Sequence, residues 1–246
     1  MCSSDLHHWS TPCWQKSWLL VSVSQPVFCR RATRRDCSPW MLCGRNSDAK
    51  YTAMASLPSL LSDIRACTIC AQHLPLGPRP IVQLSAKAKV LIAGQAPGRK
   101  VHASGVPFDD ASGNRLREWL GVTREAFYDP KQFALVPMGF CFPGTGRSGD
   151  LPPRVECAPA WREQLLAHLD QVELTLVLGQ YAQAYHFGKS SSSLTDLVKS
   201  WRAHWPQRVP LPHPSPRNNL WLRRNPWFEA ELLPPLRARV AELLDG

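Results

Sequence analysis

Residues 89–98 read Lys-Val-Leu-Ile-Ala-Gly-Gln-Ala-Pro-Gly, a short apolar run that ends in a glycine-rich turn. A run that is apolar at consecutive positions is typical of a strand buried on both faces of a parallel sheet. We predict this first strand over residues 89–94. Three further runs of the same kind follow, at residues 133–138, 174–178 and 208–211.

Helical patterns alternate with these four runs. Amphipathic segments occupy residues 112–120, 158–169, 181–187 and 194–204, and a helix over 57–67 precedes the first strand. A last helix over 227–244 contains Pro234 and Pro235, which we expect to break or kink it. The alternation predicts an α/β fold, a three-layer α/β/α sandwich with a central four-stranded parallel sheet.

The composition narrows the class of protein. The chain has 29 Lys+Arg against 19 Asp+Glu, for a net charge of +10, which favours an anionic partner without separating nucleic acid from phosphate metabolites or acidic surfaces. With 44% hydrophobic residues, extensive disorder is excluded. The longest apolar run near the start, residues 18–23, is far shorter than the roughly 20 residues of a membrane span. We expect a cytoplasmic protein with no membrane partner.

Residues 1–53 differ from the rest of the chain. They hold five of the nine cysteines, show no lasting helical or strand period, and lack the features of a secretory signal. The Arg-rich run at residues 30–35 fits a targeting segment poorly. We interpret residues 1–53 as a non-native or disordered N-terminal extension, produced by spurious translation upstream of a native start at Met54. Residues 54–246 are then one domain.

Four cysteines remain in that domain: Cys67, Cys70, Cys141 and Cys157. They form a close Cys-x-x-Cys pair followed by two distant residues, and the segment between Cys141 and Cys157 is rich in Gly and Pro. Four thiolates can hold a [4Fe-4S] cluster or a tetrahedral zinc ion. Buried apolar cysteines are the alternative interpretation.

The segments that follow the predicted strands are the places to look for chemistry, because open α/β sheets bind ligands at the carboxyl ends of their strands. After the first strand come Gly94, Gln95, Ala96, Pro97 and Gly98, and then Pro107-Phe108. After the last strand comes His213-Pro214-Ser215-Pro216-Arg217-Asn218. A histidine fixed between prolines and followed by Ser, Arg and Asn suits anionic chemistry.

These motifs resemble those of the uracil-DNA glycosylase superfamily over nearly all of residues 57–244, and the cysteine spacing is similar to its iron-sulfur branch, family 4. The His-Pro-Ser-Pro-Arg-Asn loop also resembles that of the single-strand-selective monofunctional uracil glycosylases. The resemblance implies a monomeric enzyme that flips uracil or a related deaminated base out of DNA. It would hydrolyse the N-glycosidic bond and leave an abasic site for base excision repair.

The resemblance also implies roles for residues. Gly94 to Gly98 would contact the base and position water, Phe108 would stack on the base, and His213 would donate to the base carbonyl as the leaving group gains charge. DNA phosphates would be bound by Ser215, Arg217 and Asn218. The four cysteines would hold a [4Fe-4S] cluster, with zinc as the alternative.

The chain departs from the family 4 pattern at three positions. Gln95 stands where that branch carries Glu, and Pro137 stands where it carries the Asn that reads the edge of uracil. His102 stands where it carries Asp, and we predict that it activates or orients water, with Asp109 and Asp110 as rivals.

Two other functions stay open at this point. One is a DNA-binding protein that binds or covalently traps a lesion without turnover, which the lost carboxylate and Asn favour. The other is an iron-sulfur α/β hydrolase of free nucleotides.

Overall fold

A computed structural model describes residues 55–147, 149–188 and 192–245. The predicted extension over residues 1–53 lies outside the described residues, so its interpretation stays a prediction. Among the described residues, no helix has the length and apolar character needed to cross a membrane.

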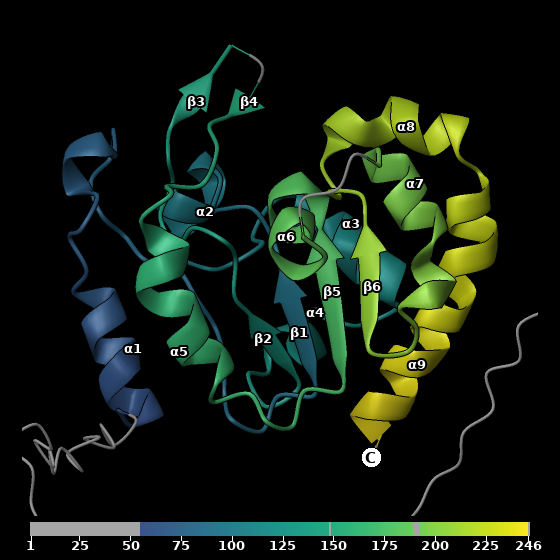
Figure 1. The fold of residues 1–246 in the computed structure, drawn as a ribbon, viewed down its shortest axis with the longest axis horizontal. Helices are drawn as coiled ribbons and strands as arrows, with labels where there is room; N and C mark the ends of the chain where they lie inside the picture. The colour runs from purple at the N-terminus through teal and green to yellow at the C-terminus, as the bar shows by residue number, and fades with distance from the viewer. Residues whose placement is uncertain (1–54, 148, 189–191, 246) are drawn as a thin grey trace, which may run out of the picture. The chain divides into compact units, whose positions relative to one another are not determined.

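The central sheet has four strands, all parallel, in the order β2-β1-β5-β6 (Figure 1). These strands are β1 (Val90–Ala93), β2 (Phe133–Leu135), β5 (Leu174–Leu178) and β6 (Arg208–Leu211). A separate antiparallel hairpin, β3 (Thr145–Gly146) with β4 (Gly149–Asp150), stands at the edge of the sheet to which the strands point. The predicted fold class is confirmed.

Nine α-helices are described around the sheet. They are α1 (Leu57–Arg65), α2 (Arg99–Ser104), α3 (Ala111–Leu120), α4 (Arg124–Tyr128), α5 (Glu163–Leu166), α6 (Gly179–His186), α7 (Leu194–Lys199), α8 (Asn219–Arg224) and α9 (Leu233–Asp245). The short helices α2, α4 and α8 and the hairpin were absent from the sequence prediction, because each is too short to show a hydrophobic period.

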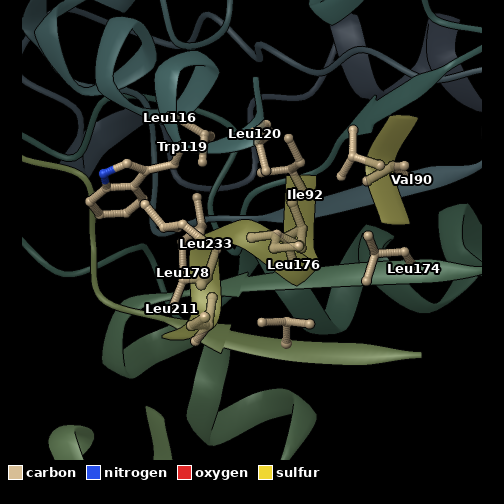
Figure 2. Close-up of a cluster of buried hydrophobic side chains, with 14 of the residues drawn as sticks. Val90, Ile92, Leu116, Trp119, Leu120, Leu174, Leu176, Leu178, Leu211 and Leu233 are labelled. Atoms are coloured by element: carbon tan, nitrogen blue, oxygen red, sulfur yellow. The ribbon is translucent and has the colours of Figure 1, made fainter. Parts of the chain in front are cut away.

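Alternate strand residues pack on opposite faces of the sheet, which creates the outer layers. On one face, Val90 and Ile92 of β1 share a core with α3, α7 and α9, as Figure 2 shows in part. On the other face, Leu91 packs with α1 and α5, and Ala93 packs near α6. Every residue of β1 is buried, which explains its continuous apolar sequence.

The C-terminal helix is not broken at Pro234 and Pro235, contrary to the prediction. The two prolines follow directly on a π-helical turn, so the chain changes its winding at the residues that lack the N–H group of a regular α-helical hydrogen bond. A π-helical turn, η5 (Phe228–Leu232), leads directly into α9 and absorbs the change in winding.

The core at the centre of the sheet gives a test of stability. Leu176 is fully buried on β5, between Ile92 of β1 and Val209 of β6. We expect Leu176→Ala to lower the free energy of unfolding by about 2–5 kcal/mol, because it removes buried apolar contacts and leaves a cavity in the core. Urea denaturation measures this loss. Leu76→Ala, at a side chain that is 47% exposed, is the control and should cost far less.

Candidate active site

The segments that follow all four strands of the sheet meet at one cavity of about 810 Å³. The predicted site residues that line it are Gly94, Gln95, Ala96, Pro97, Gly98, Phe108, His213, Ser215, Arg217 and Asn218. Parallel strands bring their carboxyl ends to one edge, so positions more than 100 residues apart in the sequence become neighbours.

The backbone holds Phe108 in an unusual conformation at the wall of this cavity. Its φ of 55° lies in the left-handed region, which bulky residues rarely adopt. Gly113 makes the conformation possible, because a β carbon there would lie 1.7 Å from the Phe108 carbonyl oxygen. The ring is half-buried, and its tip lies beside Gly94. It packs against the Phe127 ring in a T-shaped, edge-to-face arrangement. Phe108 is therefore fixed at the cavity and not sealed in the core.

Three contacts fix His213 in the loop that follows β6. The backbone N–H of Ser215 donates to its Nδ1 over 3.2 Å, and the Asn218 side chain donates to its carbonyl over 2.7 Å. Gly179, directly after β5, lies next to the ring, and a β carbon there would be in ordinary contact with Cδ2, at 3.8 Å. The loop geometry thus sets the direction of the imidazole.

The His213 imidazole is neutral at ordinary pH. Burial lowers its pKa, and the negative charges of Asp110 and Asp150 oppose that shift only in part. Because Nδ1 accepts a hydrogen bond, the hydrogen-bond pattern assigns the ring proton to Nε2. His213 therefore offers a neutral N–H donor to a ligand.

Arg115 is a site residue that the sequence analysis missed. From helix α3, its guanidinium donates to the Ser215 carbonyl over 3.0 Å and to the Asn219 side chain over 2.7 Å. It therefore ties the helix that follows Phe108 to the loop that carries His213. Helical spacing could have indicated it, because Arg115 lies three residues after Ser112 and so shares a helix face with a residue that lines the cavity.

His102 is placed away from the other predicted site residues. It is absent from the described residues that line the cavity, and its ring lies 6.1 Å from that of Phe142. Burial and the nearby Arg79 lower its pKa. Of its two rivals, Asp109 forms an ion pair with Arg124 at 2.9 Å, whereas Asp110 lines the cavity and accepts the Gly113 N–H over 2.9 Å. Of the two carboxylates, Asp110 is therefore the one that lies at the cavity.

Gln95 and Pro137, which depart from the family 4 pattern, both line the cavity. The Gln95 side chain donates to the Leu151 carbonyl over 3.1 Å, so it holds the segment after the hairpin. The carbonyl of Pro137 accepts from Arg162 over 3.0 Å. Both residues are engaged in holding the walls of the cavity.

The four cysteines Cys67, Cys70, Cys141 and Cys157 line a second, narrow cavity, and none forms a disulfide. Burial and the neighbouring thiols raise the pKa of Cys141 to about 11 and that of Cys157 to about 12. Two N–H groups point at sulfur: the backbone of Phe140 donates to Cys157, and the Trp161 indole donates to Cys67, each over 3.3 Å. Within the described ranges, no three His, Cys, Asp or Glu side chains form a set that would hold a single metal ion.

Arg162 provides a test of whether an anionic group suits this cysteine cavity. It ends the π-helical turn η2 (Ala158–Arg162) that begins after Cys157, and it is fully buried. It has no acidic partner among the residues described, and its Nε lacks a hydrogen bond. Burial lowers its pKa to about 10, and the charges of Tyr185 and then of Cys157 oppose that shift. Four thiolates around an iron-sulfur cluster would supply the missing negative charge, so the residues fit such a group.

The same arginine is hydrogen-bonded to His186 and helps to keep it neutral. Arg162 donates to His186 Nε2 over 2.8 Å, so His186 must be neutral to accept. Burial, and then the charges of Arg162 and Arg208, lower its pKa to about 4.

The His186 pKa predicts how stability changes with pH. Below pH 6.5 the unfolded chain binds a proton at His186, whereas the folded protein does not until about pH 4. The free energy of unfolding should therefore fall as pH decreases from about 6.5 to 4. His186→Gln keeps an acceptor for Arg162 and should flatten this slope in urea titrations at several pH values. An unchanged slope would contradict the assignment.

Comparison with known families agrees with this geometry. Residues 81–237 match the family model described as the uracil DNA glycosylase superfamily. The match covers well over half of the chain and includes every strand of the central sheet, Phe108 and His213. Cys67 and Cys70 precede the matched range. The chain belongs to the uracil DNA glycosylase superfamily.

Proposed function

We propose that this protein is a monofunctional DNA glycosylase that excises uracil or a related deaminated base and leaves an abasic site for base excision repair. The observation that carries the proposal is that Phe108 and the neutral His213 face one cavity at the carboxyl edge of the sheet. Membership of the superfamily supports glycosylase-like chemistry in general.

Phe108 supplies the surface that receives the flipped base. Its backbone is fixed before any ligand binds, so little freedom is lost when a base stacks on it. Stacking on an aromatic ring contributes about 1–3 kcal/mol per base and is tolerant of base identity. Phe108 therefore holds the base but does not choose it.

His213 stabilises the leaving base. Cleavage of the N-glycosidic bond moves an electron pair onto the base, and the Nε2–H of His213 would donate to the carbonyl where that charge develops. A donor placed in this way is worth about 2.7–4 kcal/mol in comparable sites. A neutral imidazole suits this task because its proton stays on the ring during bond cleavage.

Asp110 is the group that we assign to the water. Its position two residues after Phe108 places a carboxylate at the wall of the cavity, near enough to His213 to affect its pKa. A carboxylate can orient water toward the positively charged sugar and accept its proton. The placement of His102 beside Phe142 does not support the role predicted for it.

The loop after His213 is suited to the DNA backbone. Arg217 is exposed at the cavity, and Ser215 caps the short helical turn that contains it. Asn218 already donates to the His213 carbonyl, so it would act by holding the loop as well as by contacting phosphate. We propose DNA as the partner, bound by a monomer in the cytoplasm.

We further propose that the chain belongs to the iron-sulfur branch, with a [4Fe-4S] cluster on Cys67, Cys70, Cys141 and Cys157. When bound, the cluster would act as a structural cross-link between the segment after α1 and the loop that carries the hairpin. The buried charge of Arg162 and the two N–H groups aimed at sulfur support an anionic thiolate site. A zinc ion is the alternative, but it requires four sulfurs in a tighter group.

Removal of the histidine tests the glycosylase. His213→Ala should lower the rate of base release from a single-stranded oligonucleotide containing uracil at least tenfold, because the charge on the leaving base loses its donor. Abasic sites are detected as strand breaks after hot alkali. In the wild type the rate should show no acid limb down to pH 6.5, since the neutral donor persists there.

His168→Ala, at a histidine outside the cavity, is the matched control and should retain the wild-type rate. A retarded but uncleaved complex would instead indicate a lesion-binding protein. Hydrolysis of free nucleotides alone would indicate the nucleotide hydrolase.

Spectroscopy tests the cluster. Protein purified without oxygen should absorb near about 400 nm, as iron-sulfur thiolates do, and contain iron and acid-labile sulfide. Cys157→Ala should lose this absorbance, because it removes one of the four ligands. Bound zinc without the absorbance would favour the zinc alternative, and absence of both metals would exclude the cofactor.

A further inference from the structure

We infer that Gln180 reads the edge of the flipped base, in the role that Pro137 cannot fill. The inference rests on the proposed function and adds a residue that determines specificity. Two observations support it: which polar side chains in the cavity are free to hydrogen-bond a ligand, and the position of Gln180 near His213.

Three side-chain carboxamides line the cavity: those of Gln95, Gln180 and Asn218. Gln95 donates to the Leu151 carbonyl, and Asn218 donates to the His213 carbonyl. The Gln180 carboxamide makes no hydrogen bond to the described residues and is exposed at the cavity. It is therefore the carboxamide whose donor and acceptor are both available to a ligand.

Position 137 offers a base no hydrogen-bond donor. Proline has no backbone N–H, and the Pro137 carbonyl is held by Arg162, which also holds that of Val136. A base carbonyl turned toward position 137 would find no donor there and would stay unpaired. An unpaired group costs enough to slow excision about 5- to 100-fold.

Gln180 lies beside the catalytic donor. It is the second residue of α6, and the residue before it, Gly179, lies next to the His213 side chain: a β carbon built on Gly179 would be 3.5 Å from Cβ and 3.8 Å from Cδ2 of His213. Because Cδ2 is bonded to Nε2, the donor edge of His213 and the start of α6 face the same part of the cavity. Both residues line the same cavity, so we place one base against both groups.

This arrangement suits a lactam, in which a carbonyl stands next to a ring N–H. His213 can only donate, so it requires a carbonyl on the base. The Gln180 side-chain oxygen can then accept the adjacent ring N–H. Uracil, hypoxanthine and xanthine share this edge because deamination creates it, and the cavity volume admits a purine as well as a pyrimidine.

Methylation of the ring nitrogen tests the contact. Single-turnover rates are compared on oligonucleotides of one sequence that contain uracil, 3-methyluracil, hypoxanthine or 1-methylhypoxanthine. The wild type should act on the methylated bases at least tenfold more slowly than on their parents. Gln180→Ala should act on the parent bases about 5- to 100-fold more slowly, and its penalty for methylation should disappear.

Further variants separate a base contact from a structural role. Gln180→Glu keeps an acceptor for the ring N–H and should retain the discrimination against methylated bases. Gln171→Ala, at an exposed glutamine outside the cavity, should behave as the wild type. Equal thermal unfolding of the variants checks that they fold.

The outcomes are distinguishable. If the wild type releases neither parent base, the proposed glycosylase fails, and this inference fails with it. If the wild type is active and Gln180→Ala keeps the full methylation penalty, the inference alone is overturned.

Discussion

Close approach of backbone to side chain at the carboxyl edge of the sheet is the constraint on which the site depends. The Phe108 ring rests beside Gly94, where β1 ends, and the His213 ring rests on Gly179, where β5 ends. A β carbon at Gly94 would lie 3.3 Å from the Phe108 ring, closer than an ordinary contact, and Gly179 has a φ of 75°, which residues with a side chain rarely adopt. The sheet thus acts as the floor of the site, and Arg115 joins the two segments above it.

The strands were the most predictable part of the molecule, because strands buried on both faces show themselves as continuous apolar runs. The runs 174–178 and 208–211 coincide with β5 and β6. Topology then brings the loops after the strands together, so a shared cavity followed from sequence. The short helices, the hairpin and the π-helical turns depend on tertiary contacts that leave no period.

Individual side chains in the site were less predictable than its location. Arg115 acts on a loop about 100 residues away, a contact that helical spacing alone does not specify. His102 lies four residues after Gly98, yet the turn of α2 directs it toward Phe142 and not toward the cavity. Gln95 and Pro137 were identified as departures from the family pattern, and the structure shows both of them supporting the cavity walls.

The π-helical turn η2 connects the two cavities of the protein. A wider turn places consecutive residues in directions that an α-helix would not give them. Here Trp161 meets the sulfur of Cys67, while Arg162 reaches the strand end that borders the base cavity. Loss of one residue from this turn would rotate both side chains out of register at once. An insertion or deletion in this segment would therefore disturb both cavities together. Substitutions at its exposed positions, which keep its length, should be tolerated better.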